Sequence, residues 1–450
     1  MIHHKSVLAD LLTPVSAFLR VARGAKSAFL LESVEGAEKI GRYSFIGVDP
    51  KKSFDGSFEE FRRIFPEQQS ANLELPPFAG GAVGAFCYEM VREFEQLPDL
   101  QPVDTAVIDS SSGTVMMDFY PTILAFDHLK HQIVIISHEG KKQIQELEEK
   151  LYEPLVEEQD VGSLGLQDPK VKIAKTTPSN FAEEDFHSAV SRAKEYITAG
   201  DIFQVVLSQR FEVDFQGDPF NVYRALRYLN PSPYMFFLKR EDLSIAGASP
   251  EMLVRVQGND LEYRPIAGTR RRGRTLEEEG NLEQELVSDE KERAEHLMLV
   301  DLGRNDLGRV SEYGSVKLKD FMSVEKYSHV MHLVSSLKGR LRPELDRFDA
   351  LEACFPAGTV TGAPKIRAME IIGELEPSQR GIYAGSIGYL DYSGNLDTCI
   401  AIRTIVFHEG KAYLQAGAGI VADSVPEMEN KECRNKVEVL FRALEIGNNS

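Results

Sequence analysis

The stretch EMLVRVQGNDLEYRPI, residues 251–266, decides the class of fold that the sequence predicts. Its two strand-like runs flank Gly258, Asn259 and Asp260, which are residue types that favour a tight turn, so the stretch predicts a β-hairpin. Outward from this hairpin, IFQVVLSQRFEV at 202–213 is also β-branched and strand-like. Further strands are expected at 383–391, 397–407 and 411–416, and helices at 286–304, 347–354, 364–375 and 427–447. This mixture predicts an α/β or α+β fold.

The chain is expected to divide near residue 170. Residues 159–180, QDVGSLGLQDPKVKIAKTTPSN, are rich in Gly, Pro, Lys and Ser/Thr and predict a connection. After this connection, Ser179 or Asn180 is expected to cap a helix that Gly200 ends. We therefore expect one region at 1–170 and a second at 171–450.

The overall composition is that of an acidic globular protein of 450 residues, with 42% hydrophobic residues and a formal net charge of -19. This acidic balance argues against general affinity for nucleic acid, which requires a broad basic surface. No apolar run approaches the roughly 18 residues needed to cross a membrane, and the N-terminus lacks the features of a signal peptide. The four cysteines are far apart and form no CxxC pair, which suits the reducing cytoplasm.

Two stretches could be taken for nucleotide or nucleic-acid motifs. The first is RPIAGTRRRGR, residues 264–274, with five arginines. The second is GTVTGAPK, residues 358–365, in which three residues rather than four separate Gly358 from Gly362 and Pro364 stands where a P-loop has no proline. The spacing therefore disfavours a nucleotide hydrolase, although a helix N-terminus that meets an anion stays open.

Two pairs of glutamates, Glu292 with Glu295 and Glu429 with Glu432, have the i, i+3 spacing that places both members on one side of a helix. Acidic pairs on helices are usually solvated. Both of these pairs continue an apolar stripe, however, and unpaired carboxylates in a partly buried site are costly. A divalent cation is the natural counter-charge, and ligands that are all oxygen suit Mg²⁺.

Two further motifs remain ambiguous when taken alone. YSHVMHLVSS at 327–336 contains His329 and His332, which would lie close together on a helix, but a histidine in such a run is more often a core or capping residue than a catalyst. Gly417-Ala418-Gly419 follows a strand. It fits either a tight turn or a backbone that a ligand can approach closely.

Together these stretches resemble the chorismate-utilising enzymes, most closely the branch of anthranilate synthase component I. The resemblance follows the family's order through residues 180–445 and rests on DIFQVVLSQRF, NPSPYMFFL, GASPEMLV, PIAGTRRRGR, EHLMLVDLGRNDLGRV, YSHVMHLVS, GTVTGAPKIRAMEII, YAGSIGYLDYSGNLDTCIAIRT and QAGAGIVADSVPEMENKECRNK. It implies a two-layered α/β (α+β) fold with large, mostly antiparallel sheets faced by helices. It also implies an N-terminal effector-binding region before a catalytic domain that converts chorismate and ammonia to anthranilate and pyruvate, the first step of tryptophan biosynthesis.

The resemblance implies a role for each motif. The ligands of Mg²⁺ would be Glu292, Glu295, Glu429 and Glu432. The catalytic residues would be His332, Thr359 and Glu251, the last as the acid that protonates the departing hydroxyl. The substrate would be held by Gly268, Thr269, Tyr383, Arg403, Gly417, Ala418, Gly419, Gln204 and Ala267.

Two of these positions select amination by free ammonia within the family. Ala267 stands where aminodeoxychorismate synthases have a lysine that adds to the substrate covalently, and Gln204 stands where isochorismate and salicylate synthases have a lysine base. Aminodeoxychorismate synthase component I is the alternative that Ala267 disfavours. Arg271 replaces the family's usual proline, and we interpret the arginine run as the solvated rim of a site for an anionic substrate.

The resemblance also implies partners. No cysteine lies in a nucleophile-elbow setting and no glutamine amidotransferase domain is recognisable, so ammonia would come from solution or from a separate glutaminase subunit, component II, in a heterotetramer. Tryptophan would inhibit by binding between LLES at 30–33 and NPSPYM at 230–235, at Ser33, Pro231, Tyr234 and Met235.

Overall fold

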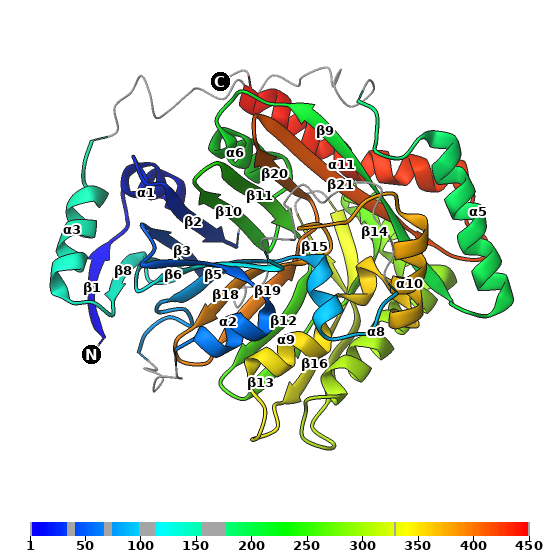
Figure 1. Cartoon of the computed structure of the whole chain (residues 1–450), viewed down its shortest axis with the longest axis horizontal. Coiled ribbons are helices and arrows are strands. Elements are labelled where there is room, and N and C mark those ends of the chain that lie inside the picture. Colours follow the sequence, from blue (N-terminus) through cyan, green and yellow to red (C-terminus); the bar gives the residue numbers. More distant parts are fainter. Residues whose placement is uncertain are drawn as a thin grey trace.

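The computed structural model describes residues 2–33, 41–66, 74–98, 113–154, 177–327 and 330–448, and two large sheets dominate it (Figure 1). The first sheet has 11 strands. Their spatial order is β1 (His3–Leu8), β8 (Gln132–Ser137), β7 (Thr122–Asp127), β3 (Tyr43–Val48), β2 (Ser27–Glu32), β10 (Tyr234–Arg240), β11 (Leu243–Ser249), β20 (Thr404–His408), β21 (Lys411–Ile420), β9 (Gln204–Asp214) and β17 (Gly362–Ala363).

The second sheet has 10 strands. Nine of them follow the order β14 (Ile266–Arg271), β16 (Val330–Arg340), β13 (Asp260–Tyr263), β12 (Met252–Gln257), β19 (Leu396–Ile400), β18 (Ser386–Asp391), β5 (Gly81–Phe86), β6 (Val115–Tyr120) and β4 (Lys52–Gly56), and β15 (Lys317–Lys326) pairs with β16. The neighbouring strands in both sheets pair antiparallel, for example β2 with β10 and β5 with β18. The mostly antiparallel α+β architecture that the resemblance implies is therefore confirmed.

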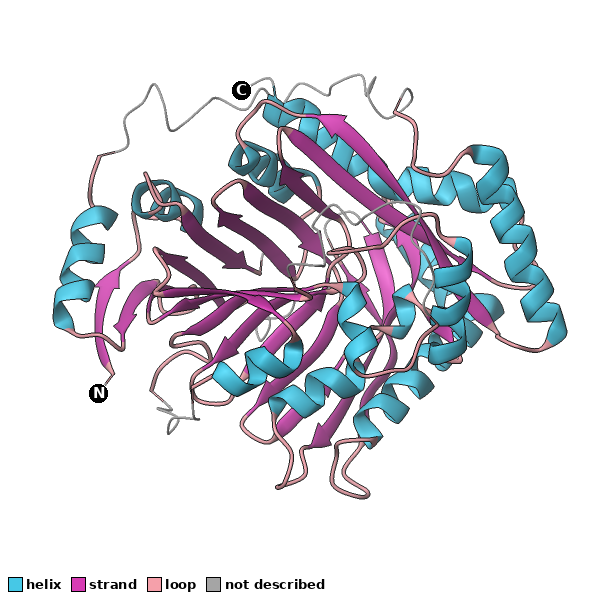
Figure 2. Ribbon diagram, viewed as in Figure 1, coloured by secondary structure: helices cyan, strands magenta, loops and turns pink. Residues whose placement is uncertain are grey.

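Helices cover the outer faces of the two sheets (Figure 2). An aromatic-rich core fills the space between the sheets. The helices packed on the first sheet are α1 (Pro14–Val21), α3 (Lys141–Leu151), α6 (Pro219–Leu229) and α11 (Pro426–Asn448). The second sheet is packed by α2 (Phe58–Ile64), the short η1 (Tyr88–Glu93), α8 (Glu290–Gly308), α9 (Arg347–Cys354) and the turn η3 (Gly358–Val360). The helices α5 (Glu183–Ala199) and α10 (Lys365–Leu375) pack on β9 and β21, and α7 (Leu276–Ser288) packs on β16.

Both sheets are built from strands on both sides of residue 170. In the first sheet β2 pairs with β10, and in the second β5 pairs with β18. The expected boundary itself lies outside the described residues. Residues 1–170 and 171–450 therefore contribute strands to the same two sheets.

The predicted hairpin is confirmed, because β12 and β13 pair around Gly258 with Gln257 opposite Asp260. Gly200 ends α5 in the left-handed conformation, as predicted. The predicted cap is wrong: α5 begins at Glu183 after Ala182, and the Ser179 hydroxyl instead accepts a hydrogen bond from the Phe181 amide.

Three predicted elements differ from the structure for local reasons. The helix expected at 286–304 is two helices, because Asp289 ends α7 and its side chain caps α8. The strand expected at 397–407 is interrupted between β19 and β20, where Arg403 has a φ of 52°. The stretch around His332 lies on strand β16, while His329 lies outside the described residues.

Candidate active site

His332 is held by the neighbouring strand β14. Thr269 pairs with His332 across the two strands, just after an irregularity at Gly268, whose φ is 65°. The Nδ1 atom of His332 lies 3.0 Å from the Gly268 carbonyl oxygen and 3.0 Å from Thr269 Oγ1. A carbonyl oxygen only accepts, so Nδ1 carries the proton and Nε2 is left unprotonated in the neutral ring. Burial lowers the pKa of His332, which keeps the ring neutral and able to act as a base.

Glu251 immediately precedes β12 and is buried, with 6% of its surface exposed. Burial raises the pKa of Glu251 to about 8, against the smaller opposing effects of the Thr359 hydroxyl and the Ile266 amide. The buried Thr359 Oγ1 has no hydrogen bond of good geometry among the described residues. Glu251 is therefore protonated at neutral pH and can donate a proton.

The turn that carries Thr359 is anchored by a buried arginine. Arg380 donates hydrogen bonds to the carbonyl oxygens of Val360 (2.7 Å) and Val206 (2.8 Å) and forms an ion pair with Glu376 (2.6 Å). Sequence analysis did not identify Arg380, since its role depends on contacts with distant segments. Arg380 connects η3 to strand β9.

Arg403 lies in the interruption between β19 and β20, where its backbone has the left-handed conformation. Among the described residues its guanidinium has no hydrogen bond or ion pair, and burial lowers its pKa, with Tyr383 and Glu432 opposing that shift. Tyr383 is itself buried and its hydroxyl lies against Gly417, where a side chain would meet it. An unpaired guanidinium beside a phenol and bare backbone is a suitable place for a carboxylate.

Gln204 and Gly419 lie together on β9 and β21, and a side chain at Gly419 would collide with the Gln204 carboxamide. The buried Gln204 Oε1 has no hydrogen-bond partner among the described residues. The side chain of Ala418, in contrast, packs into the apolar core with α5 and α10, so only its backbone is available to a ligand. Ala267 is buried on β14 next to Ile266, whose amide contacts Glu251.

The four predicted metal ligands lie in the first two turns of α8 and α11. Burial raises the pKa of Glu295, and the charges of Glu292 and Glu432 raise it further. Burial also raises the pKa of Glu429, with a further contribution from Glu432. Within the described ranges, no three acidic, histidine or cysteine side chains lie close enough together to hold an ion. The oxygen-only donor set and its mutual repulsion nevertheless fit a hard divalent cation.

A lysine that sequence analysis missed belongs to the same cluster. Lys436, one turn after Glu432 on α11, forms an ion pair with Glu432 (2.7 Å) and donates to the Gly417 carbonyl oxygen (2.8 Å). It therefore links the acidic cluster to the glycines of β21. Its i, i+4 spacing from Glu432 was the available signal.

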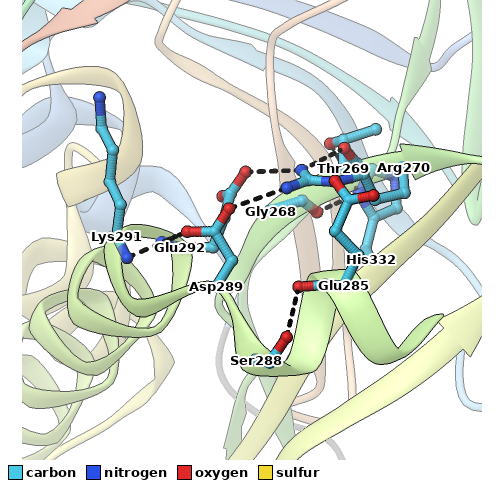
Figure 3. Close-up of polar contacts among 9 residues, drawn as sticks. All are labelled: Gly268, Thr269, Arg270, Glu285, Ser288, Asp289, Lys291, Glu292 and His332. Carbon is cyan, nitrogen blue, oxygen red and sulfur yellow. Dashed lines mark hydrogen bonds and ion pairs between the residues drawn. The ribbon is translucent and has the colours of Figure 1, made fainter. Parts of the chain in front are cut away.

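The arginine run is only partly a solvated rim. Arg271 is 58% exposed and pairs with Glu278, as a rim residue would. The interpretation is wrong for Arg270, which is 19% exposed and pairs with three carboxylates, including Glu292 (Figure 3). Arg264 is also wrongly placed at the rim, since it is 15% exposed and pairs with Glu325.

Three of the four predicted effector residues line a separate cavity of about 990 Å³ between the two sheets, and Pro231 is not among its lining residues. Ser33 and Tyr234 contribute to its wall, and Pro233 lines it next to Tyr234. Met235 also borders the cavity, but its side chain is buried in the core on the helix-covered face of the first sheet, so its backbone is what the cavity meets. Pro231, the remaining predicted residue, precedes this wall in the chain.

Sequence analysis missed a charged network in this cavity. Arg255 forms an ion pair with Asp397 (2.8 Å) and donates to the Tyr234 hydroxyl (3.2 Å), which in turn donates to Asp397 (2.9 Å). Arg255 lies on β12, the strand that follows Glu251. Arg255 in the cavity wall and Glu251 in the candidate active site are therefore connected by strand β12.

No helix in the described ranges combines the length and apolar character needed to span a membrane. All four cysteines are free and buried.

Comparisons with known proteins point to one family. The family model described as chorismate binding enzyme matches residues 26–442. The chain is 48% identical over 472 residues to anthranilate synthase component 1 of Acetivibrio thermocellus, covering 98% of this chain and 94% of that protein. It is 44% identical over 475 residues to the protein of the same name from Aquifex aeolicus, covering 99% and 95%.

Solved structures agree with this similarity. Anthranilate synthase component I from Streptococcus pneumoniae matches with a TM-score of 0.80 and 37% identity, covering 97% of this chain and 99% of that one. The menaquinone-specific isochorismate synthase MenF of Escherichia coli matches with a TM-score of 0.75 at 19% identity, which shows a shared fold.

Proposed function

Because this chain belongs to the chorismate-binding enzymes, we propose that it works as component I of an anthranilate synthase. Chorismate and ammonia would be converted to anthranilate, pyruvate and water. The observation that carries this assignment is the unpaired, buried Arg403 guanidinium, whose charge acts on both Tyr383 and the neutral His332.

The chain's own groups account for the proton transfers. Arg403 and Tyr383 would bind a carboxylate of chorismate, with the bare backbone of Gly417 and Gly419 close by. Glu251 would protonate the C4 hydroxyl, which leaves as water while ammonia attacks C2. His332 Nε2 would then accept the C2 proton as the enolpyruvyl group leaves as pyruvate. Thr269 and the Gly268 carbonyl hold the ring of His332 in the orientation that this base requires.

We propose that Glu292, Glu295, Glu429 and Glu432 hold Mg²⁺. The support is that the charges of Glu292 and Glu432, from two different helices, add to burial in raising the pKa of Glu295, which a cation would relieve. When bound, the ion would neutralise the ring carboxylate of chorismate. Replacing Glu432 by Gln should weaken Mg²⁺ binding in calorimetry and abolish turnover. Normal Mg²⁺ dependence in this variant would remove the assignment.

We propose that tryptophan inhibits by binding in the cavity between the sheets. Ser33 and Tyr234 provide polar contacts, and Pro233 provides a rigid apolar wall. Titration with tryptophan should give binding heat and loss of activity. Ser33→Leu should weaken both while leaving the activity without tryptophan unchanged. If saturating tryptophan neither binds nor inhibits, the regulatory proposal fails, while the synthase assignment can still hold.

We also propose a cytoplasmic location, which four reduced, buried cysteines suit. The partner would be a glutaminase, component II, in a heterotetramer.

Incubation of the purified chain with chorismate, Mg²⁺ and ammonium tests the main assignment. Anthranilate and pyruvate, identified by mass and by anthranilate fluorescence, are the expected products. Aminodeoxychorismate as the main product would instead support the folate-pathway alternative, which the small, buried Ala267 disfavours. Glu251→Gln is the control, since its side chain has the size and neutral charge of the protonated acid but cannot donate the proton.

A further inference from the structure

Arg270 lies at the centre of three carboxylates that come from the end of α7 and the start of α8 (Figure 3). Its Nε lies 2.9 Å from Glu285, its Nη2 lies 2.9 Å from Asp289, and its Nη1 lies 2.9 Å from Glu292. Each of the three guanidinium nitrogens therefore contacts a different carboxylate. The proposed function assigns no role to this residue.

The contact with Asp289 fixes the start of α8. One carboxylate oxygen of Asp289 accepts hydrogen bonds from the amides of Lys291 (3.0 Å) and Glu292 (3.1 Å), which makes Asp289 the helix cap. The other oxygen accepts from Arg270. A single side chain on β14 therefore holds both the cap of α8 and the carboxylate of Glu292.

The contact with Glu292 leaves one of its oxygens available. Oε1 accepts the hydrogen bond from Arg270, whereas Oε2 faces Gly268. A Cβ atom at Gly268 would lie only 3.0 Å from Oε2, so the absence of a side chain there makes room for this oxygen. The carboxylate is held by one oxygen and presents the other.

The same short strand also holds the candidate base. The Gly268 carbonyl oxygen and the Thr269 hydroxyl form hydrogen bonds with Nδ1 of His332, and Arg270 is the next residue along β14 (Figure 3). A displacement of β14 relative to α8 would therefore move Glu292 and His332 apart.

We propose that Arg270 is a positioning residue that locks the first turn of α8 to β14, so that Glu292 presents Oε2 to the bound cation. This inference rests on the proposed role of Glu292 as a ligand of Mg²⁺. Groups that orient metal ligands in this way commonly contribute about 10–100-fold to metal affinity.

The positive charge of Arg270 should weaken Mg²⁺ binding, whereas its positioning of Glu292 should strengthen Mg²⁺ binding. A guanidinium near the site repels a divalent cation, so a purely electrostatic role predicts tighter Mg²⁺ binding when the charge is removed. Three carboxylates share this one guanidinium, so the cluster stays negative and attracts a cation. Orientation is therefore expected to outweigh repulsion.

Three variants of the full chain separate these effects. Arg270→Gln removes charge and geometry, and Arg270→Lys keeps the charge but loses the three-way fork. Arg271→Gln is the matched control, because it makes the same charge change at the next residue, which is 58% exposed and pairs with Glu278 instead. Each is titrated with Mg²⁺ alone by calorimetry, and amide hydrogen exchange at residues 290–296 is measured without metal.

We expect both Arg270 variants to bind Mg²⁺ at least about tenfold more weakly and to exchange faster at 290–296, with Arg271→Gln like the unmodified chain. In turnover, the Mg²⁺ concentration for half-maximal rate should rise in parallel. Unchanged or tighter Mg²⁺ binding in Arg270→Gln would overturn the positioning role alone. If the unmodified chain binds no Mg²⁺, the proposed metal site fails and the positioning role toward a cation fails with it, whereas the exchange data still report whether Arg270 holds α8.

Discussion

Burial acts on Glu251 and His332 in opposite directions, because it favours the uncharged form of each group. It raises the pKa of Glu251 and lowers the pKa of His332. At neutral pH the acid is therefore protonated and the base is free. This is the pair of states that removal of a hydroxyl and of a ring proton requires.

The pH dependence of the rate follows from Glu251. At a fixed concentration of unprotonated ammonia, kcat/KM should fall as the pH rises through about 8, because ionised Glu251 cannot donate a proton. The measurement is a pH series of initial rates with the free ammonia held constant. A rate that stays level to well above pH 8 would contradict the assignment of Glu251 as the acid.

Stability provides an independent measurement on the same group. Burial raises the pKa of Glu251 in the folded chain from its ordinary value of 4.5 to about 8. Between pH 4.5 and about 8, Glu251 is therefore protonated in the folded chain but ionised in the unfolded chain. The resulting stability is lost as the pH rises toward about 8. The Tm of the unmodified chain should therefore fall more steeply over this range than that of Glu251→Gln.

Ala267 should govern the nucleophile. Ala267→Lys places an amine in a buried position next to Ile266, whose amide contacts Glu251. We expect the ammonia-dependent activity to fall at least about tenfold, and intact-protein mass to reveal a covalent adduct with chorismate. Ala267→Met, which has similar bulk but no amine, should lose activity without an adduct. Unchanged activity in the lysine variant would mean that position 267 does not face the substrate.

At this scale the sequence was enough to name the candidate groups of the site, because their identities lie within long motifs. It missed Arg380 and Lys436, and it wrongly placed Arg270 at a solvated rim. What these three residues do is defined by partners brought close by folding, such as Val206 for Arg380 and Gly417 for Lys436. A charge in a motif does not reveal which carboxylate or carbonyl it will meet.

Among the elements, the short turn η3 is anchored to strand β9 by a single buried side chain, Arg380. Arg380→Met removes two hydrogen bonds to backbone carbonyls and leaves Glu376 buried without its cation. Removing one partner of such a pair should lower the free energy of unfolding by about 3–5 kcal/mol. Denaturant unfolding of the variant measures this loss.

The control for this prediction is Arg304→Met. Arg304 pairs with Asp301 on the surface of α8, where both side chains are about two-thirds exposed. Exposed pairs contribute little, so unfolding should be unchanged within error. Equal losses in the two variants would show that burial of Arg380 is not what gives its ion pair its importance.

The elements that the sequence predicted poorly are those that tertiary contacts terminate. Residues 397–407 are apolar and β-branched enough to be taken for one strand. The structure interrupts this stretch after Ala401, which still bonds to Gly385 beside the end of β18, before Arg403 turns the chain into β20. Arg403 adopts its left-handed backbone in the same interruption. The hairpin at Gly258, in contrast, was predictable because its turn residues are local.

For the whole molecule, the source of ammonia is the main expectation. All four cysteines are buried, and burial raises the pKa of each thiol, that of Cys433 to about 12. None is available as the thiolate nucleophile that would attack glutamine. The chain alone should therefore use ammonium and ignore glutamine, and a glutaminase partner should restore the use of glutamine. Product formation with each nitrogen source, with and without the partner, is the measurement, and efficient use of glutamine by the chain alone would contradict it.

The sharing of both sheets across residue 170 has a consequence for how this protein can be varied. The N-terminal part cannot be exchanged with that of a relative as a self-contained cassette, since β2 takes its neighbour β10 from the other part of the chain and β5 takes β18. A chimera joined near residue 170 would have to preserve the pairing register of β2 with β10 and of β5 with β18 at the same time. Substitutions in either part are therefore constrained by the strands that it pairs with in the other part.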